Sequence, residues 1–210
     1  FPRALLNSLM IAFLTTVCCL LISILGSYAM TRLKYPGRRF FKTSIIFSYL
    51  IPTAVLFVPM YVFVSKLGFY DNKWALLIIY PTTVVPYCCY MLMSYFKAIP
   101  YALEEAALID GCTRMKSLRY IITPIALPGI AVVATFAFTM SWNEYLYAMI
   151  MTTSPAQQTA VVAISSFKYA DSAIWGRIMA ASVLTSLPVT IIYIVAQAQL
   201  ISGKSDGSVK

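Results

Sequence analysis

The sequence contains no histidine, and only 11% of its 210 residues are charged. Without an imidazole, neither a Ser–His or Cys–His nucleophile pair nor a histidine metal site can form. The five cysteines lack the C-x-x-C spacing of zinc and redox sites, and no glycine-rich phosphate loop is present. We therefore expect no metal, no cofactor and no nucleotide site of these kinds.

Apolar residues make up 60% of the chain, and its mean hydropathy is +0.80. A soluble fold of this size could not hide so much apolar surface. Because roughly 20 apolar residues cross a bilayer as a helix, the sequence predicts an all-α integral membrane protein. Five apolar stretches are long enough to be single spanning helices: about 5–30, 40–64, 74–96, 121–150 and 174–201.

The basic residues are divided unevenly between the two sides of these predicted spans. Eleven of the sixteen fall in segments 32–42 and 97–119 and in the tail after residue 203. The positive-inside rule places those segments, and the carboxyl end, in the cytoplasm. The net charge of +9 is then an orientation signal and not a nucleic-acid footprint. The amino end falls outside, so we expect one further helix upstream, making this chain the last five spans of six.

The connection 98–120 is unusually polar, since it holds three of the seven acidic residues of the chain. Pro100 suits the first turn of a helix, and Gly111 supplies the left-handed turn that ends one. Small apolar residues between them form one face. Composition leaves two alternatives, a solvated helix at the membrane interface or a helix that docks on a protein. A flat alanine face has little area to bury in lipid, which favours the protein partner.

The same connection carries a family resemblance. Glu105-Ala106-Ala107, Gly111, Ile121 and Thr123-Pro124 resemble, in order and spacing, the EAA loop of ABC-importer permease subunits, with Thr123 in place of the family's leucine. Further stretches are similar to the MalG-like permeases of carbohydrate importers: 7–9, 27–38, 67–71, 142–146 and the tail from Ala196. The family's first helix has no counterpart in this sequence.

The resemblance implies a MetI/MalG-like permease core over residues 1–210, without its first helix, and a cytoplasmic EAA coupling loop at 98–120. It implies a multi-pass subunit of the bacterial plasma membrane that is not itself an enzyme. Its expected partners are a second homologous permease, two ABC ATPase subunits, an external solute-binding protein, a sugar and membrane lipid, but no nucleic acid. The residues expected to couple it to the ATPase are Glu104, Glu105, Ala106, Ala107, Asp110, Gly111 and Pro124.

Glu144 is the one carboxylate inside a predicted span, where an ionisable group is costly and suggests function. It belongs to a predicted substrate pathway made of Trp142, Asn143, Glu144 and Tyr145, in which the polar groups bond sugar hydroxyls and the rings stack on the sugar. The alternative is a glutamate at a helix end within an aromatic belt. The segment 152–168 is either a re-entrant loop or a contact for the binding protein.

Other functions remain as alternatives. An ABC permease for an amino acid, phosphate, a polyamine or a metal would share the EAA loop but not the Trp142–Leu146 stretch and the tail. A secondary transporter usually shows internal repeats and more intramembrane charges. A membrane-embedded hydrolase needs histidine or paired intramembrane carboxylates, and the sequence offers neither.

Overall fold

Long apolar helices make up most of the protein. The structure is a computed structural model that describes residues 1–167 and 175–205, and for residues 198–205 it describes the backbone only. No strand occurs in these ranges. Two short turns of other helix types, a 3₁₀ turn at Lys73–Ala75 and a π turn at Leu118–Ile122, accompany the α-helices. The α-helices are α1 (Pro2–Arg32), α2 (Arg38–Leu50), α3 (Thr53–Lys66), α4 (Leu76–Ala98), α5 (Tyr101–Ile109), α6 (Arg114–Ser117), α7 (Thr123–Ile125), α8 (Leu127–Trp142), α9 (Leu146–Met151), α10 (Ala160–Ser166) and α11 (Trp175–Ser205).

Three helices in the described ranges are long and apolar enough to cross a membrane by themselves: α1, α4 with its preceding 3₁₀ turn, and α11. The other two predicted spans are each divided. α2 and α3 meet at 99°, and the segment 114–125 meets α8 at 81°. The predictions of continuous helices over 40–64 and 121–150 were therefore wrong. The count of five spans holds only if each bent pair is one span.

Proline explains the first break. Ile51 is extended, with φ −72° and ψ 122°, because the ring of Pro52 disfavours the helical conformation in the residue before it. The second bend centres on Ala126, between two more prolines, and follows the π turn. At the far end of α8 the helix stops at Trp142, so the predicted fourth span also loses its last turns to a separate helix, α9.

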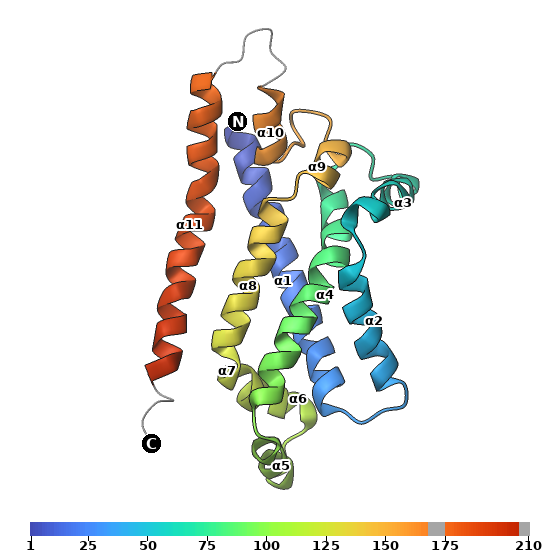
Figure 1. Ribbon diagram of the computed structural model, residues 1–210, viewed down its shortest axis with the longest axis vertical. Helices are drawn as coiled ribbons and strands as arrows, with labels where there is room; N and C mark the ends of the chain where they lie inside the picture. Colours follow the sequence, from blue (N-terminus) through green and yellow to red (C-terminus); the bar gives the residue numbers. More distant parts are fainter. Residues whose placement is uncertain (168–174, 206–210) are drawn as a thin grey trace.

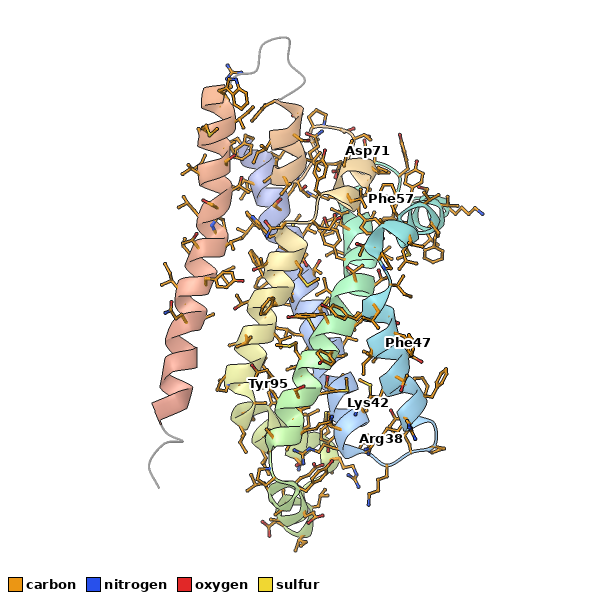
Figure 2. All side chains as sticks on the ribbon, viewed as in Figure 1. Arg38, Lys42, Phe47, Phe57, Asp71 and Tyr95 are labelled. Atoms are coloured by element: carbon orange, nitrogen blue, oxygen red, sulfur yellow. The ribbon has the colours of Figure 1, made fainter. Side chains whose placement is uncertain are left out.

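The centre of the bundle is formed by α1, α4 and α8, as Figure 1 shows. Buried side chains of these helices make an apolar core, with Leu92, Phe96 and Val133 among its fully buried members. Gly129 of α8 lies against the ring of Tyr95 of α4, so closely that a Cβ there would be 2.4 Å from the ring. Figure 2 shows Tyr95 at this helix contact.

The two ends of the bundle carry different elements (Figure 1). α5, α6, α7 and the end of α11 lie at one end, and α3, α9, α10 and the amino terminus at the other. Arg38 and Lys42 lie toward the α5 end, and Asp71 lies at the opposite end (Figure 2). α11 packs along α8 and α10 but leaves large apolar side chains exposed, Met179, Val183 and Ile194 among them. Such a surface suits lipid or another membrane subunit.

Candidate functional site

Local signals define α5, the short helix at the polar end. Pro100 precedes its first turn in an extended conformation, with ψ 136°. Gly111 adopts φ +83° after its last turn, and the amide of Cys112 then donates to the carbonyl of Ala107 at 3.0 Å. A following cap, the Thr113 hydroxyl accepting from the amide of Lys116 at 3.3 Å, starts α6. The sequence predicted this helix and the glycine that ends it.

α5 has an outer and an inner face, and the expected coupling residues are divided between them. Glu105, Ala106 and Asp110 are exposed on the outer face, where Ile109 is 86% exposed. Glu104 and Ala107 are buried against the bundle, at 3% and 5% exposure. The structure thus brings together a solvent-facing set of small and acidic side chains, but it places Glu104 away from them.

Pro124, the last residue of the expected coupling set, is exposed in α7. It lies within the segment that makes the 81° bend with α8. A Cβ added to Gly111 would have no heavy atom within 4 Å, so the left-handed conformation of this residue, and not crowding, requires glycine.

Glu104 instead joins a buried polar cluster that sequence reasoning missed. The Tyr28 hydroxyl donates to Glu104 Oε1 at 2.5 Å, and Arg32 Nε lies 3.8 Å from Oε2. Arg114 Nη1, itself largely exposed, lies 3.9 Å from Oε1. The sequence indicated no more than an orientation charge at Arg32. The four-residue spacing of Tyr28 and Arg32 places both on one face of α1, but no local signal connects that face with Glu104.

A cavity of about 930 Å³ opens beside this cluster, between α5 and the turn that follows α1. Its charged lining contains four cations and two carboxylates: Arg32, Lys34, Arg38, Arg114, Glu104 and Glu105. The excess of positive charge agrees with the basic character of this end of the bundle.

A second, smaller cavity of about 240 Å³ contains two of the four predicted pathway residues, Asn143 and Glu144. α4 contributes Tyr80 and Thr83 to its wall, and Thr53 at the start of α3 also lines it. These three residues were not predicted, since they are far from residue 144 in the sequence. The Tyr80 residue is only 1% exposed, and its hydroxyl has no hydrogen-bond partner among the described residues.

Glu144 also has a local structural role. Its two carboxylate oxygens accept hydrogen bonds from the amides of Tyr147 and Ala148, at 3.0 and 3.1 Å. The carboxylate therefore caps the start of α9, where the helix dipole favours negative charge. It lies between two helices, not within one.

The other two predicted pathway residues do not line this cavity. Trp142 is buried, stacks on Phe138 at 5.5 Å and donates its indole N–H to the carbonyl of Thr185 in α11 at 3.2 Å. Tyr145 packs against an apolar cluster that contains Met151 and also Tyr80 and Tyr147, two residues of the cavity wall. Of the four predicted pathway residues, the polar pair therefore lines the cavity and the two aromatic residues do not.

The segment after α9 is tied to two other parts of the chain. Asn7 donates to the carbonyls of Ala156 and Gln158 at 3.1 and 3.0 Å. Asp71 accepts from both the hydroxyl and the amide of Ser154, and these bonds lower the pKa of its carboxyl. The predicted loop 152–168 therefore has an anchored first part and contains α10, while Lys168 lies outside the described residues.

Comparison with known proteins agrees with this geometry. Residues 22–204 match the family described as "Binding-protein-dependent transport system inner membrane component". The chain is 37% identical to the inner membrane ABC transporter permease protein YcjP of Escherichia coli over 97% of this chain and 73% of that protein. It is 34% identical to the trehalose/maltose transport system permease protein MalG of Thermococcus litoralis over 100% of this chain and 76% of that one.

A solved structure shares the fold. It is a chain of a bacterial ABC transporter involved in the import of the acidic polysaccharide alginate. The TM-score is 0.82 at 23% identity, covering 94% of this chain and 74% of the other. The bent helix pairs therefore occur in a chain that shares its overall fold with a chain of that transporter.

Proposed function

The chain belongs to the family of binding-protein-dependent transport system inner membrane components, and on this premise we propose that it imports a mono- or oligosaccharide. Family membership makes it a multi-pass permease component of the inner membrane that works with an ATPase and a substrate-binding protein. The sugar class is supported by the trehalose/maltose permease of Thermococcus litoralis, which matches all of this chain over 76% of its own length.

The proposed complex contains this chain, a second homologous permease, two ATPase subunits and an external solute-binding protein. ATP hydrolysis occurs on the ATPase subunits, and its free energy reaches the pore mechanically. The observation that carries this arrangement is the outer face of α5, where Glu105 and Ala106 are exposed on a helix whose other face is buried. Such a face offers close approach at the alanines and a carboxylate for a basic group on the ATPase.

The proposed orientation puts α5 and the end of α11 in the cytoplasm. It is supported by the basic residues at this end, which line the larger cavity and follow α1. Asp71, Ser154 and the anchored segment after α9 then face outward, toward the binding protein. In this orientation the smaller cavity lies in the outer half of the bundle, where Asn143 and Glu144 meet the sugar before it crosses.

The coupling role of α5 is tested by Glu105→Lys in the complex reconstituted in proteoliposomes with its ATPase and binding protein. We expect normal membrane insertion, but uptake that no longer follows ATP hydrolysis, because the substituted lysine repels the basic group on the ATPase. Lys66→Glu, a charge reversal on an exposed residue of α3, is the matched control and should couple normally. Normal coupling in the Glu105→Lys complex would falsify the assignment.

The substrate class is tested separately with radiolabelled trehalose, maltose, methionine and phosphate in the same proteoliposomes. We expect ATP-dependent uptake of a sugar only. Uptake of methionine or phosphate in place of both sugars would replace the sugar proposal while leaving the permease assignment intact.

A further inference from the structure

The buried cluster around Glu104 connects α5 with the two central helices of the bundle. Arg32, whose side chain is fully buried, is the last residue of α1. Its Nη2 donates to the carbonyls of Phe96 and Ile99 at 2.5 and 2.6 Å, where α4 ends. The Phe96 carbonyl, in the last turn of α4, also accepts from the Ile99 amide at 3.4 Å, and a cation is favoured at that end of the helix dipole. One side chain of α1 thus caps α4.

The same guanidinium is also attached to α5. It lies 4.2 Å above the ring of Tyr101, and the Tyr101 hydroxyl donates to the carbonyl of Thr31 at 2.6 Å. Glu104, one turn further along α5, accepts from Tyr28 of α1 and lies beside Arg32 Nε. Arg32 Nε and Glu104 Oε2 form no hydrogen bond at 3.8 Å, so the attraction between them is electrostatic, and a buried carboxylate and a buried guanidinium are costly apart. α1, α4 and α5 therefore meet at one charged pair.

We propose that the Arg32–Glu104 pair is the joint that makes α5 move with α1 and α4 as one rigid unit. Glu104 is then a positioning residue and not a contact for the ATPase. The inference rests on the proposed function of α5: the outer face receives the displacement from the ATPase, and the inner face passes it to the bundle. Without the joint, α5 would remain linked to the bundle by the bond from the Tyr101 hydroxyl to the Thr31 carbonyl and by the chain connections at Ile99–Pro100 and Gly111.

The test measures the distance between spin labels on α5 and α1 in the complete complex in lipid. With the native cysteines replaced, labels are placed at Leu103→Cys, which is not one of the residues expected to contact the ATPase, and at Leu25→Cys, positions that are 43% and 49% exposed. A rigid joint predicts a narrow distance distribution that is the same without nucleotide and with bound ATP. In Glu104→Gln the distribution should broaden, while the ATPase still co-purifies because the outer face of α5 is intact.

Uptake per ATP hydrolysed should fall about five- to tenfold in Glu104→Gln, within the usual range of coupling between two sites. Tyr28→Phe removes one hydrogen bond but keeps the ion pair, and should have a smaller effect. If Glu104→Gln does not fold, Glu104→Asp takes its place, since it keeps the charge but shortens the reach to Arg32. A merely structural pair would lower the yield but leave the distance distribution of the folded protein unchanged.

Two results would overturn the proposal. One is an unchanged distribution in both Glu104 variants. The other is loss of ATPase binding in Glu104→Gln to the same extent as in Glu105→Lys, which would make Glu104 a contact residue. Failure of the proposed function looks different: the ATPase would not bind the unmodified chain, yet the narrow distribution in the chain alone would still support the joint.

Discussion

At the scale of single residues, the Tyr80 hydroxyl gives the cleanest probe of the proposed sugar route. It is buried without a partner among the described residues, beside Asn143 and Glu144. Removing this hydroxyl leaves no other polar group without a hydrogen-bond partner. Tyr80→Phe should therefore change the free energy of unfolding by less than about 0.5 kcal/mol. If the hydroxyl bonds the passing sugar, uptake below saturation should fall about three- to tenfold, the value of one hydrogen bond.

Tyr87→Phe is the control for that experiment. Tyr87 is on the same helix, half-buried, and it does not line this cavity. It should alter neither stability nor uptake. Equal uptake by both variants, measured as initial rates in proteoliposomes with equal amounts of protein, would remove the smaller cavity from the sugar route.

Gly111 provides the second prediction at this scale. Its φ of +83° is open to glycine and, at low cost, to asparagine, whereas a β-branched residue there is strained by about 1–2 kcal/mol. Since no atom lies within 4 Å of a Cβ at this position, the two variants differ in backbone strain and not in crowding. We expect Gly111→Asn to keep most of the coupling between ATP hydrolysis and uptake, and Gly111→Val to lose it.

Coupling is measured as uptake per ATP hydrolysed, with membrane insertion as the check on folding. We expect higher coupling in Gly111→Asn than in Gly111→Val because asparagine adopts the left-handed conformation at lower cost. Equal coupling in the two variants would show that the turn after α5 does not set the direction of the loop.

At the scale of helices, the contact between α4 and α8 depends on Gly129. A Cβ at this position would be 2.4 to 2.8 Å from atoms of the Tyr95 ring, well inside van der Waals contact. Gly129→Ala should therefore destabilise the protein by about 1–3 kcal/mol, as overpacking does in other cores. Thermal unfolding in detergent measures the loss, and adding Tyr95→Leu should recover part of it.

Gly176→Ala is the matched change, because no atom of the described residues lies within 4 Å of a Cβ built there. Because Gly176 lies in the first turn of α11 and alanine favours a helix more than glycine does, this substitution should leave the stability of the protein unchanged or raise it slightly. Equal loss of stability in Gly129→Ala and Gly176→Ala would show that contact with Tyr95 is not the cause.

Helices also show how far local sequence signals reach. Pro100 and Gly111 define α5 through the conformations they allow, and the helix is where they predict it. The hydropathy of the sequence, in contrast, does not show where a helix bends. The apolar run 40–64 continues through Ile51 and Pro52, where α2 and α3 meet at 99°. Pro52 was a visible signal, but prolines inside α3, α4 and α11 leave those helices continuous. Packing decides between the two outcomes.

At the scale of the whole molecule, the polar clusters are assembled from segments that are distant in the sequence. The smaller cavity combines Thr53, Tyr80 and Glu144, and the buried joint combines Arg32 with Glu104. The sequence indicated Glu144 because it is the one carboxylate inside a predicted span. It could not predict that Thr53 and Tyr80 line the same cavity. For the same reason it grouped Glu104 with Glu105, since only the packing of α5 against α1 separates the two side chains.

The orientation of the whole bundle can be tested with a native thiol. Cys112 follows α5 and is partly exposed, whereas Cys19, Cys88 and Cys89 are buried and Cys18 lies on the apolar surface of α1. A membrane-impermeant maleimide needs a hydrated thiolate, so it should react with Cys112 alone. If α5 is cytoplasmic, the reagent should label Cys112 in inside-out vesicles but not in intact cells or spheroplasts. Tyr70→Cys at the opposite end, 61% exposed, should give the reverse pattern, and labelling of Cys112 from outside would invert the proposed topology.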